Sequence, residues 1–298
     1  MKIGFIGAGK VGCSMGKYLV EHDISVAGYS SQTKESVDTA ATFTKTKAFK
    51  SMEDLVSACD LIFITTPDGC ISQVWDQIAK YSEQRKIVCH FSGSLSSAVF
   101  SNREEHDICA CSLHPMYAFS DKFTSYQKLN QVIFTAEGDL EALETVRSLF
   151  DKTGNQVCVI PSEQKQLYHA AASVVSNMMI GLYDMGIRML TRCGFVEDKA
   201  RQLVFPLVAG NIQSVLDTSP EQALTGPIER GDASTVAGHL AVLTDAERVV
   251  YVNLGRVLVD IARKKNPQRD YTEIETILQN GGQYEKHSSY LSGNEEKR

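Results

Sequence analysis

Short apolar runs alternate with amphipathic stretches along the first 160 residues of the chain. Apolar runs of about 4–8 residues bounded by turn-forming residues predict strands, and apolar positions three or four residues apart predict helices. Strands that alternate with helices are typical of an α/β fold with a doubly wound parallel sheet. The predicted strands are 2–6, 24–29, 60–65, 86–90, 107–113, 132–135 and 156–160, and the predicted helices include 12–19, a short one from 51, one that ends at 80, and 140–150.

The pattern changes after Pro161. From Glu163 onward the apolar positions follow a helical spacing, with Ser162 as a predicted N-cap and Gly194 as a stop signal. This helix would have ~30 residues and a length of ~45 Å. We therefore expect a sheet domain over 1–160, an all-α domain over 161–285 with further helices at 196–216, 220–224, 233–243, 245–263 and from 271, and a polar tail over 286–298.

Three glycines follow the first predicted strand directly, in the order Gly7-x-Gly9-x-x-Gly12. The first permits a tight turn, the second lets the backbone approach a pyrophosphate, and the third lets the next helix pack closely on the strand. The free N–H groups at the start of that helix then face the phosphates. A strand, a glycine turn and a helix in this order predict a dinucleotide site, and the alternative is a turn that binds nothing. The predicted contacts are Gly7, Ala8, Gly9, Lys10, Val11 and Gly12.

The residues after the second predicted strand bear on the choice between NAD and NADP. An NAD site places an acidic residue there, about 20 residues after the glycine turn, to bind the ribose 2′-hydroxyl. Here Ser30, Ser31 and Lys34 stand instead, and they can hold a 2′-phosphate, which favours NADP. The alternative is that Ser30 or Ser31 only caps the next helix. Because ligands of such sheets lie beyond the carboxyl ends of the strands, we also expect cofactor contacts from Thr65, Thr66 and Pro67.

Composition and charge exclude several classes of protein. The net charge is −6 and no long basic run is present, which argues against a nucleic-acid partner. None of the eight cysteines has zinc-ligand spacing, so we expect reduced thiols and no metal site. The first strand begins at Lys2, which leaves no room for a signal peptide, and no apolar run is long enough to span a bilayer. We therefore expect a cytoplasmic protein without a membrane partner.

The long predicted helix carries a polar stripe at Lys165, His169, Ser173 and Asn177. A step of four residues turns a helix by only ~40°, so these side chains share one face of an otherwise alanine-rich helix. Polar groups buried on such a face need partners, and a substrate beside the nicotinamide can be one. Lys165 or His169 can act as the proton donor of a reductase, and Asn177 can donate to the substrate oxygen. The alternatives are bonds to other protein groups for Ser173 and a solvated charge for Lys165.

Two further positions carry candidate chemistry. A loop between predicted helices contains Thr225 and Arg230, and an arginine there can bind a substrate carboxylate through two parallel hydrogen bonds. A surface ion pair of Arg230 with Glu229 or Asp232 explains the same residues. His114 lies at a strand end, where active-site groups gather, or else is a packed residue before the turn-forming Pro115.

Several of these segments together resemble a family. The chain resembles the two-domain NADP-binding reductases related to pyrroline-5-carboxylate reductase and to the hydroxyacid and 6-phosphogluconate dehydrogenases. The resemblance is strongest to a branch in which a Rossmann-like domain precedes a helical domain of unknown function. It rests on the glycine turn, Ser112-Leu113-His114-Pro115-Met116, Tyr168-His169-Ala170-Ala171-Ala172 with Asn177, and Leu224-Thr225-Gly226-Pro227-Ile228-x-Arg230-Gly231-Asp232.

Some members of this branch resemble an alternative class of ketopantoate reductase, which makes pantoate for coenzyme A synthesis. That resemblance implies NADPH as cofactor, a 2-oxo acid as substrate and helical domains that pair in a homodimer. The chain departs from the better-known ketopantoate reductases and hydroxyacid dehydrogenases, which place an Asn three or four residues after the catalytic lysine. Here Tyr168 and His169 occupy those places and Asn177 comes later, so either Lys165 or His169 remains a candidate acid.

We therefore expect an NADPH-dependent reductase of a small 2-oxo acid, with 2-dehydropantoate (ketopantoate) as the best single candidate. Two alternatives remain at this point. One is an imine reductase of the pyrroline-5-carboxylate reductase type. The other is a non-catalytic NADP-binding sensor or assembly protein.

Overall fold

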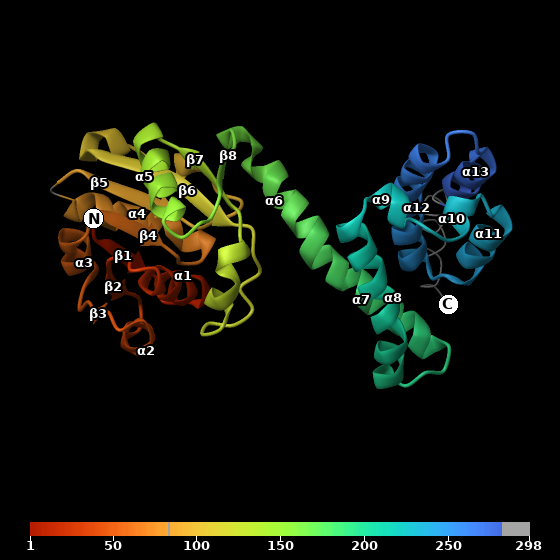
Figure 1. The fold of residues 1–298 in the computed structure, drawn as a ribbon, viewed down its shortest axis with the longest axis horizontal. Helices are drawn as coiled ribbons and strands as arrows, with labels where there is room; N and C mark the ends of the chain where they lie inside the picture. Colours follow the sequence, from red (N-terminus) through yellow and green to blue (C-terminus); the bar gives the residue numbers. More distant parts are fainter. Residues whose placement is uncertain (83, 282–298) are drawn as a thin grey trace, which may run out of the picture. The chain divides into compact units, whose positions relative to one another are not determined.

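An eight-stranded sheet forms the core of the N-terminal part of the chain (Figure 1). The structure, a computed structural model, describes residues 1–82 and 84–281. All neighbouring strands are parallel except β6 and β7, which confirms the predicted α/β class with one antiparallel pair. The strand order is β3-β2-β1-β4-β5-β6-β7-β8, and β3 was not predicted. The strands are β1 (Ile3–Ile6), β2 (Val26–Ser30), β3 (Lys47–Ala48), β4 (Leu61–Ile64), β5 (Lys86–His90), β6 (Ile108–Pro115), β7 (Phe134–Gly138) and β8 (Val157–Val159).

Helices cover both faces of this sheet. Alternate residues of one strand enter different clusters, as Phe63 and Ile64 of β4 do, because successive side chains of a strand point to opposite faces. The Phe63 cluster contains side chains of α1, α2 and α5, and the Ile64 cluster contains those of α3 and α4. The sheet is therefore doubly wound, as predicted. The helices are α1 (Lys10–Glu21), α2 (Lys34–Thr44), α3 (Met52–Ala58), α4 (Ile71–Tyr81) and α5 (Leu140–Asp151).

A long helix follows the sheet, as the sequence predicts. It runs over Ser162–Arg192 as a 3₁₀ turn, α6 (Lys165–Ser173), a π-helical segment (Val174–Met178) and α7 (Met179–Arg192). The predicted N-cap role of Ser162 is wrong, because Pro161 occupies the cap position and no side chain caps the turn. Gly194 follows the helix with a φ of +95°, a left-handed conformation that favours glycine and suits its predicted role as a stop.

The chain divides into two compact units, Met1–Met178 and Met179–Arg298. The first half of the long helix therefore groups with the sheet, whereas the sequence predicted a boundary at 160. The contact of Lys165 explains this grouping, since its buried ammonium donates to the Ser92 carbonyl oxygen beyond β5. The predicted polar tail, 286–298, lies outside the described residues.

One described helix is long and apolar enough to cross a membrane by length and composition. Ser162–Arg192 has 31 residues and reaches a mean hydropathy of 1.2 over 18 residues, so the expectation that no such stretch exists was wrong. The sequence shows no unbroken apolar run here because small and polar residues interrupt the apolar ones. This is weak evidence for a span. Lys165 is buried in the first unit, and Arg192 pairs with Glu247 in the second, so protein contacts hold both ends.

The described part of the second unit, which ends at Gly281, has helices and no strands, as predicted. Its core contains Ile228, Val236, Val252, Val259 and Leu278. Thr244 and Glu247 form a reciprocal capping box at the start of α12, which fixes where that helix begins. The helices of this unit after α7 are α8 (Glu197–Asp217), α9 (Pro220–Ala223), α10 (Pro227–Arg230), α11 (Ala233–Val242), α12 (Asp245–Lys265) and α13 (Thr272–Gly281).

Candidate functional site

The glycine turn between β1 and α1 has the geometry that the sequence predicts. Gly7 has a φ of +108°, which a side chain rarely tolerates. A Cβ on Gly12 would collide with the Gly7 carbonyl oxygen and lie 2.5 Å from Thr65 Oγ1, so only glycine lets α1 pack this closely. Gly9 has no atom within 4 Å of the same position, which leaves open space beside the backbone at the start of the helix. These features provide room for a pyrophosphate at the helix N-terminus.

A cavity of about 610 Å³ opens beside this turn. Eight predicted cofactor contacts line it: Gly7, Ala8, Gly9, Ser30, Ser31, Thr65, Thr66 and Pro67. Lys10, Val11, Gly12 and Lys34 are not among the lining residues. Thr33, rather than Ser30 or Ser31, caps α2, because its side chain accepts a hydrogen bond from the Ser36 N–H. The alternative role of Ser30 and Ser31 as helix caps is therefore wrong.

The residues that line this cavity suit the phosphates and hydroxyls of a dinucleotide. The cation among its lining residues is Lys50, which sequence reasoning missed because it follows the unpredicted strand β3. Gln32 and Ser36, which follow β2 in the chain, also line this cavity. The Thr66 hydroxyl is buried and has no hydrogen-bond partner among the described residues. A buried hydroxyl without a partner is costly, so a ligand group in the cavity would satisfy it.

A polar platform lies on one face of the sheet and extends over three neighbouring strands, β5, β6 and β7. Its side chains share a face because paired residues of adjacent strands point the same way. The antiparallel register pairs Ser112 with Glu137 and His114 with Thr135, and the parallel register pairs His90 with Ser112. Most of the platform is fully buried, which requires polar partners. It comprises His90, Ser112, His114, Thr135 and Glu137.

Lys165 lies at this platform with only 2% of its surface exposed. Its Nζ donates a 3.0 Å hydrogen bond to the Ser92 carbonyl oxygen. Burial lowers the pKa of this ammonium from its ordinary 10.5 to about 8, although the charges of Glu137 and Asp68 act in the opposite direction. The alternative of a solvated end charge for Lys165 is therefore wrong. An amine with a pKa near neutrality is suited to proton transfer.

Two imidazoles meet above Gly93. A Cβ on Gly93 would lie 2.6 Å from His169 Nδ1 and 2.9 Å from His114 Nε2, so glycine is required for both rings to approach. His169 Nδ1 is buried and has no hydrogen-bond partner among the described residues. His114 Nδ1 lies 2.8 Å from the Tyr168 hydroxyl, and burial lowers the pKa of His114 to about 4. His114 is thus neutral at physiological pH and keeps Nε2 for a ligand.

The loop after β5 holds these groups in place. Asp68 Oδ2 accepts hydrogen bonds from the Ser92 hydroxyl at 2.7 Å and from the Ser94 hydroxyl at 3.0 Å. Asp68 follows Pro67 of the dinucleotide cavity directly, so the same short segment borders the cavity and fixes the loop that carries Gly93. The cavity and the polar platform are therefore joined through one set of hydrogen bonds.

The structure brings only part of the predicted stripe together. Lys165 and His169 lie near His114 at the platform, and the role of His114 stays a prediction. Asn177 is exposed and lies eight residues after His169, or ~12 Å further along the helix axis. Its side-chain oxygen accepts a hydrogen bond from the hydroxyl of the neighbouring Ser176. The π-helical segment also changes the phase of the helix before Asn177. Ser173 is half-buried, and its predicted role in substrate binding stays a prediction.

Thr225 and Arg230 belong to the second unit and are exposed. The carboxylates expected to pair with Arg230 bond elsewhere. Glu229 accepts from Asn266 at 2.7 Å, and Asp232 caps α11 by accepting from the Thr235 N–H at 3.1 Å. Within 1–82 and 84–281, no group of three His, Cys, Asp or Glu side chains is arranged to hold a metal ion.

Several residues of the site were missed by the sequence analysis. Glu137, Ser112 and Gly93 can be recognised as neighbours of the site only after the strands have been aligned in the sheet. One signal was present: Ser112-x-His114 and Thr135-x-Glu137 alternate polar and apolar residues, which indicates one polar face at the end of each strand. The register that brings these two faces together is a property of the tertiary structure.

Two family models match separate parts of the chain. Residues 2–92 match the family described as NADP oxidoreductase coenzyme F420-dependent, and residues 132–258 match a domain of unknown function, DUF2520. The chain is therefore similar to an NADP oxidoreductase domain in its first part and to a DUF2520 domain in its second part. The DUF2520 match includes β7, the long helix and most of the second unit, so it contains Glu137, Lys165 and His169. No curated protein sequence matches the chain.

Solved structures share the fold at low sequence identity. A protein of Thermotoga maritima is 24% identical with a TM-score of 0.69, over 88% of this chain and 99% of its own. A protein of Bacteroides fragilis assigned as an NADP oxidoreductase is 22% identical with a TM-score of 0.67, over 87% and 98%. The Plasmodium falciparum pyrroline carboxylate reductase with NADP bound is 13% identical with a TM-score of 0.55, over 95% and 97%. These likenesses support the Rossmann-type fold with a helical second part.

Proposed function

We propose that this protein is an NADPH-dependent reductase of a small 2-oxo acid, with 2-dehydropantoate as the best single candidate. A buried lysine of lowered pKa beside a dinucleotide cavity is the observation that carries the proposal. The match of residues 2–92 to an NADP oxidoreductase family supports the cofactor. Reduction of 2-dehydropantoate would place the protein in pantothenate biosynthesis, and its eight free cysteines support a cytoplasmic location.

The residues of the platform have distinct roles in this proposal. NADPH, when bound, supplies the hydride. Lys165 is the general acid, because its ammonium is half-way to deprotonation near pH 8 and is shielded from bulk water. His114 Nε2 and His169 Nδ1 orient the carbonyl oxygen of the substrate above Gly93, where both nitrogens converge. Ser30, Ser31 and Lys50 hold the 2′-phosphate.

NADPH oxidation with a panel of 2-oxo acids and cyclic imines tests the proposal. We expect turnover of a 2-oxo acid, a loss of about 10²-fold or more in kcat/KM for Lys165→Met, and a smaller loss for His169→Ala. Turnover of cyclic imines alone would identify an imine reductase instead. Cofactor binding without turnover of any compound, unchanged in Lys165→Met, would identify a sensor. Asn177→Ala, Thr225→Ala and Arg230→Ala report whether the remaining predicted residues take part.

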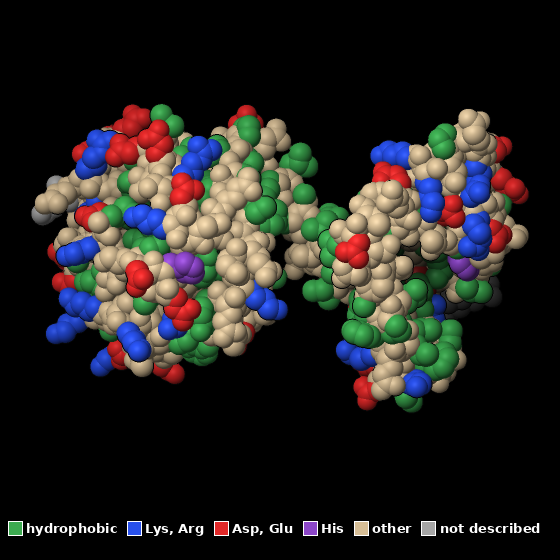
Figure 2. Space-filling model, viewed as in Figure 1, with side chains coloured by type: hydrophobic (Ala, Val, Ile, Leu, Met, Phe, Trp, Pro, Cys, Tyr) green, Lys and Arg blue, Asp and Glu red, His purple; other side chains and the backbone are tan. Residues whose placement is uncertain are grey.

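We further propose that a second copy of the chain covers α7 and α8. Figure 2 shows hydrophobic side chains gathered over these helices, and Ile180, Phe205 and Leu207 are each more than 60% exposed. An apolar groove of about 490 Å³ lies between the two helices. Exposed apolar surface of this extent is typical of an interface. Analytical ultracentrifugation should give a dimer that Leu207→Glu dissociates, and a monomeric wild type would contradict it.

A further inference from the structure

A buried polar row crosses three strands of the sheet. His90 of β5, Ser112 of β6 and Glu137 of β7 are direct partners in the two registers. Each of the three is at most 2% exposed. Directly opposite side chains on one face have Cβ atoms about 4.5–5.5 Å apart, so neighbouring members are within reach of a hydrogen bond or of one bridging water. The row is part of the polar platform and runs from His90 on β5 to Glu137 on β7.

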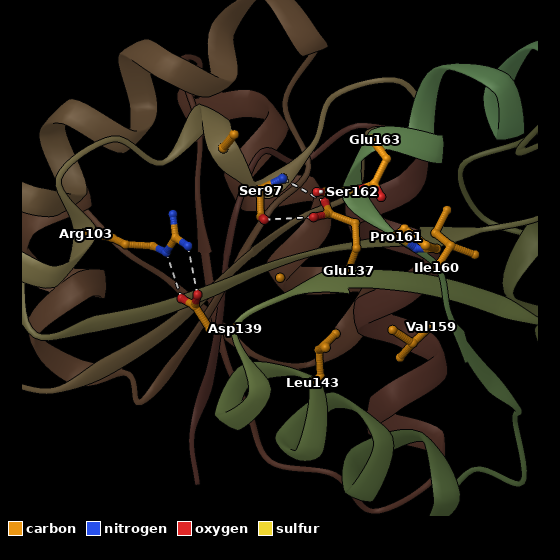
Figure 3. Close-up of a pocket in the computed structure, with 12 residues that line it drawn as sticks. Ser97, Arg103, Glu137, Asp139, Leu143, Val159, Ile160, Pro161, Ser162 and Glu163 are labelled. Atoms are coloured by element: carbon orange, nitrogen blue, oxygen red, sulfur yellow. Dashed lines mark hydrogen bonds and ion pairs between the residues drawn. The ribbon is translucent and has the colours of Figure 1, made fainter.

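The outer end of this row opens into a second cavity. Glu137 lines a space of about 480 Å³ together with Ser97, Ser162 and Glu163 (Figure 3). This cavity shares no lining residue with the dinucleotide cavity. The Glu137 carboxylate accepts 2.7 Å and 2.8 Å hydrogen bonds from the backbone N–H and the hydroxyl of Ser97. Since a carboxylate has about four acceptor sites, it can still bind water from the cavity.

Lys165 lies beside this row, close enough for its charge to act on His90 and for the charge of Glu137 to act on it. Among the neighbouring charges, Glu137 contributes most to keeping this ammonium protonated, ahead of Asp68. Ser112 Oγ is buried and has no hydrogen-bond partner among the described residues. A hydroxyl can donate and accept at the same time, and an unpartnered buried one costs about 1–3 kcal/mol unless a water or a mobile proton engages it. The Ser112 hydroxyl is therefore available to pass a proton between its register partner Glu137 and Lys165.

The inference rests on the proposed reduction, which requires that Lys165 be protonated again after each turnover. Lys165 gives one proton to the substrate oxygen in each turnover and becomes a neutral amine, which must regain a proton. Bound cofactor and substrate cover the dinucleotide side of the site during turnover and exclude water there. A route from another side of the domain would let the lysine recover while product is still bound.

We propose that Glu137 and Ser112 form a proton route from the second cavity to Lys165. A solvent proton, carried by hydronium in the cavity, adds to the Glu137 carboxylate and leaves water, the carboxyl group passes its proton to the Ser112 oxygen, and the Ser112 O–H proton moves to the Lys165 amine. One solvent proton enters for each proton that leaves with the alcohol product, so the balance closes without a further reactant. Glu137 and Ser112 act through Lys165 in this route, so they are relay residues.

Two measurements on the full chain test this route. In protein labelled with ¹⁵N-lysine, NMR gives the rate at which the Lys165 Nζ protons exchange with solvent, free and with NADP⁺ added. We expect Glu137→Gln and Ser112→Ala to slow this exchange by about tenfold or more. Glu163→Gln, a carboxylate of the same cavity outside the row, should leave it unchanged. Ser112→Ala removes only an unbonded hydroxyl, so it keeps the test valid if Glu137→Gln fails to fold.

The second measurement separates the route from the proposed function. With a 2-oxo acid that the wild type reduces, Glu137→Gln should lower kcat while the first hydride transfer, followed in stopped flow, stays within about twofold, and small weak acids should restore kcat. Equal loss in both phases, or no loss in either, would overturn the route. If no substrate is found, the proposed function fails, and the exchange rates still decide the route: unchanged exchange in both variants overturns it.

Discussion

The buried ammonium of Lys165 gives the sharpest prediction, because its pKa sets a pH range. In the proposed reaction the ammonium is the acid, so activity requires its protonated form. With a pKa of about 8, about 90% of the lysine is protonated at pH 7 and about 10% at pH 9. An ordinary lysine, with a pKa of 10.5, would remain almost fully protonated at both. We therefore expect kcat/KM at pH 9 to be about one tenth of its value at pH 7.

The cause of the lowered pKa can be tested as well. Desolvation lowers it most, whereas the charges of Glu137, Asp68 and Cys111 raise it. Glu137→Gln should therefore lower the pKa of Lys165 and move the basic limb of the pH profile of kcat/KM to lower pH. Asp68→Asn, which removes a negative charge outside the buried row, should shift the limb in the same direction. Lys165→Arg should abolish the limb, because a guanidinium does not deprotonate in this range.

The assay is the initial rate of NADPH oxidation at low substrate concentration, which reports the ionisations of the free enzyme. Thermal melting at each pH checks that the protein stays folded. A wild-type rate that is constant up to pH 10 would refute the role of Lys165 as the acid. The same limb in Lys165→Met would assign the titration to another group.

Three further predictions follow from single contacts. Calorimetry should show that Lys50→Ala raises the Kd for NADPH by about tenfold and leaves the Kd for NADH unchanged. Lys34→Ala is the matched control, because Lys34 does not line the cavity. Gly93→Ala should displace both imidazoles and lower kcat/KM without lowering the melting temperature greatly. Burial lowers the pKa of His90 to about 4, so the unfolded chain binds its proton first as pH falls below 6.5. Denaturant titration should therefore show that His90→Gln loses about 2 kcal/mol less stability than the wild type between pH 7 and pH 5, whereas the similar contribution of His114 remains.

The amino-acid sequence by itself determined the local elements and the cofactor turn. Apolar runs and helical spacing specify strands and helices because the pattern of each lies within a few neighbouring residues. The same holds for Gly7 and Gly12, whose roles depend on a single turn. Even so, the two-residue strand β3 was missed, since two residues carry no pattern, and with it the position of Lys50 beside the cavity.

Only the tertiary structure decided which polar residues form the site. The sequence placed Lys165 and Asn177 on one stripe, but the π-helical segment and the packing of Lys165 against Ser92 separate them. The pairing of Ser112 with Glu137 depends on the register between β6 and β7, which the intervening segment does not fix. Burial and register arise from long-range packing, and these two properties set the lowered pKa of Lys165 and the place where His114 and His169 converge. Residue type supplied the chemical groups, and the packed sheet determined which of them can act together.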